Sequence, residues 1–360
     1  MPFVLINKFR GAIAGSILGY LIGLHYSSTY QTSNTPISSA LDLSWLAHPQ
    51  QDAEGVSEET VQGLLALFFN ATHENSSPEM SHPQDMYDTP NVPVSAHLQA
   101  KSDINRAIAP ILQMLEVLTH LVDDRSTTLS GHTNPTPLRL SVAESHPLQA
   151  IFTLFPILLL YHESTAKQQR LVEPWLQQWQ YLNSEEWSID FRAVGLCLAQ
   201  AIQSNSNTSL GQNVTLRERP SHHERPLGNS VNRVPTAELK AESSDRLHPS
   251  IRSCCDAFLN YSSSYEMGTL SLLHTRSKKD WAILPLMTGL TGSLLGCNEG
   301  FSGLPLIWQH TISSYQRSLT ASPHANPKLD RGTKLAALWS GLNNSSRQWL
   351  PTTTLPRSTV

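Results

Sequence analysis

Few residues in this chain have types and spacing that could support chemistry. Glu58 and Glu59 are adjacent carboxylates that directly follow Ser57. By themselves they predict a helix N-terminus, with Ser57 as the N-cap and acidic residues in the first turn. The His162-Glu163 pair follows a strongly apolar segment. It could line a cleft, or it could be a helix end that satisfies its own polar groups.

The sequence contains no motif for other common enzyme chemistries. The chain has no G-x-S-x-G nucleophile elbow, no P-loop and no G-x-G-x-x-G after a strand. Its cysteines lack C-x-x-C spacing and have no histidine at zinc-finger distance. Adjacent cysteines could form a redox pair, but buried free thiols in a cytosolic protein are the simpler prediction. The cysteines are Cys197, Cys254, Cys255 and Cys297.

The charge balance also limits the classes of partner. Net charge is −4, the pI is about 6.4, and charged residues make up 15% of the 360 residues. No basic patch indicates a nucleic-acid partner, and no acidic tail indicates a basic one.

The segments that must position these residues have helical periodicity. Apolar residues recur at helical spacing along much of the chain, and no convincing alternating run predicts a strand. We therefore expect an all-α fold, a compact multi-helix domain. Pro110 is expected to kink its helix, and Pro156 to interrupt the central apolar one. The predicted helices span residues 9–26, 57–71, 103–121, 148–161, 168–182, 189–203, 249–259, 266–274, 283–295 and 328–342.

Glycines recur on one helical face in two apolar segments, 8–23 and 288–308, where they would let other helices approach closely. The first segment has a basic start like that of a signal peptide. However, its apolar stretch is shorter than the ~20 residues that a membrane-spanning helix needs. The strict four-residue step favours a tightly packed buried helix. These glycines are Gly11, Gly15, Gly19 and Gly23.

Two polar regions interrupt the helical pattern. Residues 72–100 are rich in Ser, Pro, His and Asn, and residues 205–248 have almost no aromatic residues. The longer region has too little apolar surface to offset the entropy cost of ordering, which predicts a disordered insertion. We expect one domain over residues 1–345 and a flexible tail over 346–360.

Four segments, in the same order along the chain, resemble the ADP-ribosylglycohydrolase family, including its ADP-ribosyl-[dinitrogen reductase] hydrolases. Residues 10–23, RGAIAGSILGYLIG, are similar to the opening helix usually written RGALLGLAVGDALG. Residues 57–60 are similar to its Thr-Asp-Asp-Thr motif, and 264–270 to the run before the last metal motif. Residues 280–296 resemble that last motif, GGDADTTAAITGALAGAYYG, and Gly303-Leu304-Pro305 and Trp308 are similar to the family residues C-terminal to it.

The resemblance implies an all-α fold with a two-metal site that cleaves ADP-ribosyl bonds. Magnesium ions would orient ADP-ribose and activate a water for attack on the anomeric carbon. Carried over by position, the metal ligands are Ser57, Glu58, Glu59 and Asp280, and Glu59 is the catalytic residue. The implied partners are ADP-ribose or an ADP-ribosylated protein. The free cysteines favour a cytoplasmic location.

The chain departs from the family pattern where the ligands should be. Tyr20 stands in place of an Asp, and Glu58 and Glu59 each replace a shorter Asp. The last motif has lost its second Asp and both threonines, and lysines replace its glycines. The substituted positions are Ala282, Ile283, Leu284, Lys278 and Lys279.

Two functions are consistent with these departures. The first is a degenerate, catalytically weak or inactive homologue that serves as a binding or scaffold protein. The second is an active hydrolase that uses Glu58, Glu59 and Asp280 with one metal ion.

Overall fold

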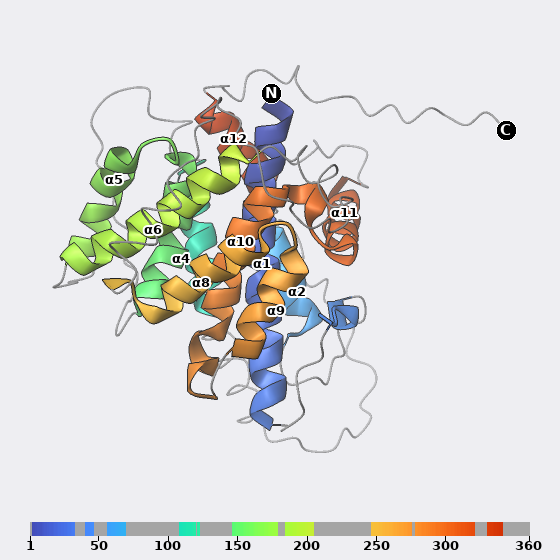
Figure 1. Ribbon diagram of the computed structural model, residues 1–360. Helices are drawn as coiled ribbons and strands as arrows, with labels where there is room; N and C mark the ends of the chain where they lie inside the picture. The colour runs from blue at the N-terminus through green and yellow to red at the C-terminus, as the bar shows by residue number, and fades with distance from the viewer. Residues whose placement is uncertain are drawn as a thin grey trace, which may run out of the picture.

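The computed structural model describes residues 2–32, 40–46, 56–69, 108–119, 121–122, 146–178, 184–204, 246–275, 278–320 and 330–340. Within these ranges the chain is largely helical and contains no strand, which confirms the predicted all-α class. Helices α1 (Pro2–Thr32) and α10 (Leu284–Glu299) pack against each other along the middle of the molecule, and other helices surround them (Figure 1).

The surrounding helices differ in which side of this central pair they occupy. In Figure 1, α4, α5, α6 and α8 lie to the left of the pair, and α2 and α11 lie to the right. The bounds are α2 (Glu58–Phe68), residues 108–119, α4 (Pro147–Leu160), α5 (Thr165–Gln178), α6 (Ser184–Gln203), α8 (Pro249–Tyr261), α9 (Tyr265–Thr275), α11 (Leu306–Thr320) and α12 (Arg331–Trp339), with short 3-10 turns η1 (Ser44–Leu46), η5 (Lys278–Ile283) and η6 (Phe301–Gly303).

Helices α1 and α10 run antiparallel and meet along what we call the glycine seam. A Cβ atom added to Gly11 would overlap the carbonyl oxygen of Gly296, and one added to Gly15 would overlap that of Gly292. The close approach of the two backbones explains the strict four-residue step in the sequence. The seam consists of Gly11, Gly15, Gly19 and Gly23 on α1 and Thr288, Gly292 and Gly296 on α10.

Two buried aromatic side chains from other helices donate hydrogen bonds to backbone carbonyls of α1 at the seam. The Tyr265 hydroxyl donates to the carbonyl of Gly15 at 2.7 Å, and the Trp308 indole N–H donates to that of Ala14 at 3.0 Å. Both side chains are buried, so these hydrogen bonds form away from water. Two further elements, α9 and α11, therefore hold the same turn of α1.

Lys8 joins the start of α1 to the end of α6. Its side chain is buried, and its ammonium donates to the carbonyls of Ala201 at 2.7 Å, Ile202 at 2.9 Å and Ser204. The last carbonyls of a helix have no partner within the helix and carry partial negative charge, so a cation is favourable there. Burial lowers the pKa of Lys8, whereas Cys297 acts to raise it.

Several helices differ in detail from their predicted form. Helix α4 continues through Pro156, although this residue has no N–H to donate to the carbonyl of Phe152. Pro110 lies within the described helical residues 108–119, and the predicted start of this helix, residues 103–107, lies outside the described residues. Helix α11 was not predicted, although Trp308, Ile312, Tyr315 and Leu319 follow helical spacing.

The predicted polar regions fall mostly outside the described residues. The region 72–100, most of 205–248 and the predicted tail 346–360 lie there. The last three residues of the predicted insertion, 246–248, are part of the helical body. Leu247 is buried, and the His248 side chain caps α8 by accepting from the N–H of Ser250. None of the described helices is both long enough and apolar enough to cross a membrane.

Candidate functional site

Ser57, Glu58 and Glu59 form the start of α2. The Ser57 hydroxyl accepts from the backbone N–H of Thr60 at 3.2 Å and lies 2.9 Å from the Thr60 hydroxyl, so it acts as the N-cap. Glu58 and Glu59 are exposed in the first turn. This geometry is that of an ordinary acidic helix N-terminus, whose partial positive charge the two carboxylates stabilise. The same geometry leaves both carboxylates accessible from solvent.

Asp280, the remaining proposed ligand, lies in η5 directly before α10. The side chains of Lys278, Lys279 and Asp280 lie outside what the structure describes. The backbone of η5 packs against both α1 and α10. Within the described part of the chain, no three His, Cys, Asp or Glu side chains are grouped so that they could hold a metal ion. Of the predicted ligands, the structure thus places Ser57, Glu58 and Glu59 together at the start of α2.

Tyr20 occupies the α1 position where the opening motif of the family has an Asp. Its ring is buried and stacks on Phe152 of α4, with ring centroids 5.6 Å apart and planes inclined by 25°. Gly289 of α10 faces the same two side chains. Burial raises the pKa of the Tyr20 phenol well above its usual value, which keeps it neutral. The structure thus places an aromatic core contact at this position.

The histidine pair His146 and His248 was not predicted. Each ring caps a helix by accepting a backbone N–H, at the start of α4 and of α8 respectively, and each is followed by proline. The two rings lie 4.5 Å apart at 84°. Burial, and then His248, lower the pKa of His146 to about 4. The repeated His-Pro dipeptide before an apolar helix was the available sequence signal, because proline favours the first helical position.

The four cysteines are free and buried, as predicted. Cys197 of α6 and Cys255 of α8 interact through their thiols. This hydrogen bond, followed by burial, raises the pKa of Cys255 well above its usual value. Reactive cysteines need accessible thiolates, so this cluster has the character of core packing.

The sequence leaves two roles open for His162 and Glu163, namely to satisfy a helix end or to line a cleft, and each residue has one of them. The His162 ring is buried between Phe9 and Trp339, and its Nδ1 lies 3.0 Å from the carbonyl of Leu159 near the end of α4. Glu163 is exposed and lines a pocket between the α4–α5 turn and α12. The histidine therefore satisfies the helix end, and the glutamate faces an opening.

Glu299 is the carboxylate with the most unusual surroundings among the described residues. It ends α10, where the helix dipole is negative, and its Oε1 is buried without a hydrogen-bond partner. Burial raises the pKa of Glu299 to about 7; the backbone N–H of Tyr265 opposes this rise, and Glu266 adds to it. A raised carboxyl pKa means that the folded state holds the proton more tightly than the unfolded state does.

We expect Glu299→Gln to change how stability depends on pH. In the unchanged protein, stability should fall as pH rises from about 4.5 to above 7, since folding must then bury a charge. The variant should lack this loss and be more stable at pH 8 by about 1 kcal/mol, a value reduced for solvent screening. Urea unfolding at pH 5.5 and pH 8 measures this, with Glu116→Gln, at an exposed carboxylate on helix 108–119, as the control. Equal pH dependence in all three proteins would contradict the assignment.

Comparison of the chain with protein-family models, with curated proteins and with solved structures finds no match in any of the three. The resemblance to ADP-ribosylglycohydrolases therefore rests on the residues of the four segments themselves.

Proposed function

We propose that this chain is a degenerate ADP-ribosylglycohydrolase-like protein of the cytoplasm that binds or scaffolds and does not catalyse hydrolysis. The observation that carries the proposal is the burial of Tyr20 against Phe152. In the family pattern this position carries a carboxylate close to the metals. A buried phenol packed on a second aromatic ring supplies no anionic ligand there.

The packing around Tyr20 also supports a retained scaffold. The glycine seam brings the two segments that resemble the opening and closing motifs into direct backbone contact. This contact is made by glycines and backbone atoms and not by the carboxylates of the predicted metal site, so it can persist where those carboxylates are lost. The inferred ligand is ADP-ribose or an ADP-ribosylated protein, because the resemblance implies that class.

The alternative is an active hydrolase that uses one metal ion held by Glu58, Glu59 and Asp280. The exposure of Glu58 and Glu59 at the start of α2 favours it, since both carboxylates are accessible to a hydrated cation. Glu59 would then act on the attacking water. In that case the residues present would hold Mg²⁺ with fewer carboxylates than a two-metal site requires.

Calorimetric titration separates the two functions. ADP-ribose is titrated into the protein with and without Mg²⁺ or Mn²⁺, and release of ADP-ribose from an ADP-ribosylated protein is followed in parallel. We expect ADP-ribose to bind without metal and no release to occur. Glu59→Gln should change neither result, and Glu116→Gln, an exposed carboxylate on helix 108–119, is the matched control.

The other outcomes are equally informative. Metal-dependent release that is lost in Glu59→Gln and kept in Glu116→Gln would overturn the proposal in favour of the hydrolase. Absence of both binding and release would remove ADP-ribose as the ligand and leave a protein-binding scaffold.

A further inference from the structure

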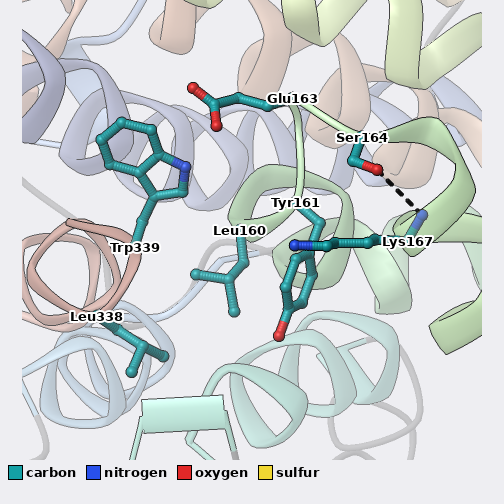
Figure 2. Close-up of a pocket in the computed structure, with 7 residues that line it drawn as sticks. All are labelled: Leu160, Tyr161, Glu163, Ser164, Lys167, Leu338 and Trp339. Atoms are coloured by element: carbon teal, nitrogen blue, oxygen red, sulfur yellow. Dashed lines mark hydrogen bonds between the residues drawn. The ribbon is translucent and has the colours of Figure 1, made fainter. Parts of the chain in front are cut away.

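A shallow pocket of about 190 Å³ lies where the α4–α5 turn faces the end of α12 (Figure 2). Leu160 and Leu338 supply its apolar surface, and Tyr161 and Trp339 contribute aromatic rings. The Trp339 ring is fixed by its neighbours inside the protein: its centroid lies 5.5 Å from that of His162 and 6.4 Å from that of Phe9. One side of the pocket is thus a preformed aromatic surface.

Opposite charges line the same pocket. Glu163 and Lys167 are both exposed, and neither forms an ion pair with any residue that the structure describes. Figure 2 shows the Glu163 carboxylate on the Trp339 side and the Lys167 ammonium beside Tyr161. The Ser164 hydroxyl oxygen accepts from the backbone N–H of Lys167 at 3.3 Å, which leaves its own proton available to a ligand.

We propose that this pocket binds a small zwitterion, a free amino acid. A ligand with one negative and one positive group satisfies both unpaired side chains at once, and the aromatic rings can cover its apolar part. The pocket is smaller than the ~300–1,000 Å³ typical of sites for drug-sized ligands, so it suits a small molecule. It is also too small for ADP-ribose, and the inference does not depend on the function proposed above.

The chemistry assigns each end of the ligand to one side. The ligand carboxylate binds the Lys167 ammonium and the Ser164 hydroxyl, both of which are donors. The ligand ammonium binds the Glu163 carboxylate. On that side the cation also gains from the nearby Trp339 ring, because indole attracts positive charge to its face.

The test is calorimetric titration of each of the twenty free L-amino acids into the full chain at low ionic strength. We expect at least one to bind with a Kd below about 1 mM. Its N-acetyl derivative removes the positive charge, and its carboxamide removes the negative charge. Each should bind about tenfold more weakly, because each loses a charge-assisted hydrogen bond.

Variants locate the binding in the pocket. Glu163→Gln and Lys167→Gln should each weaken binding of the amino acid about three- to tenfold. The loss is modest because water partly screens the attraction between each side chain and the ligand group of opposite charge. Both positions are exposed, so the variants should fold, and Glu116→Gln on helix 108–119 controls for loss of a charge. Failure of all twenty amino acids to bind, or binding of the N-acetyl and carboxamide derivatives as tight as that of the free amino acid, overturns the proposal. Unchanged binding in both pocket variants does so too.

Discussion

Gly15→Ala should destabilise this protein by roughly 3 kcal/mol or more, at the upper end of what overpacking costs in a core. The added methyl group would overlap the carbonyl oxygen of Gly292. That oxygen belongs to a helix backbone and cannot rotate away as a flexible side chain could. Relief requires α1 and α10 to separate, which would also strain the hydrogen bond from Tyr265 to the Gly15 carbonyl.

Gly63→Ala is the matched control for this substitution. Gly63 lies on the exposed face of α2, and a Cβ there meets nothing within 4 Å. The change should stabilise the protein by about 0.5–1 kcal/mol, because alanine loses less backbone freedom than glycine in a helix. Urea unfolding of both variants measures the difference. Similar effects of the two substitutions would contradict the tight contact between the helices.

Lys8→Met should cost about 2–4 kcal/mol of unfolding free energy. Methionine has a similar length and fills the space, so the main loss is the ammonium that binds the end of α6. The partly buried carbonyls of Ile202 and Ser204 would then lose this donor, and that of Ala201 would keep only the Ser204 hydroxyl. Acceptors that lose a charged donor away from bulk water are expensive. The gain from no longer burying a charge offsets part of the loss.

Hydrogen exchange gives this prediction a local readout. The amides in the last turns of α6 should exchange faster in Lys8→Met, because the helix end loses its cap. Lys334→Met on α12, a partly exposed lysine, controls for the loss of a positive charge. If Lys8→Met and Lys334→Met have equal stability, Lys8 does not hold α6 in the way described.

The fold class and the central packing could be predicted from the sequence because the spacing of apolar residues and of glycines along each helix indicates both. The four-residue glycine step on α1 and the apolar run of α4 both follow from spacing alone. Sequence reasoning failed where tertiary packing decides the outcome. Helix α4 continues through Pro156 because it is buried along its length, and packing can outweigh one lost hydrogen bond.

The pocket and the surroundings of Glu299 were less predictable, because residues that are distant in the sequence create them. The pocket combines Glu163 and Lys167 at one helix junction with Trp339 from α12, and nothing in their local spacing links them. The same holds for Glu299, whose surroundings come from the packing of α9 and η6 around the end of α10. The cap at Ser57 was predictable, because a cap and its partner lie within one helical turn.

The glycine seam also sets an order of events during protein synthesis. Trp308 of α11 and the α1 carbonyl that it binds are 294 residues apart, and α10 is the α-helix just before α11, so α1 is made long before either helix exists. At roughly 5–20 residues per second, α1 waits about 15 to 60 s on the ribosome. During that time the side chains of Ile13, Ile17 and Leu21, which end fully buried, have no core to enter. The nascent chain should therefore depend on chaperones until α10 emerges, and its final folding step should be slow, as for other contacts of long range.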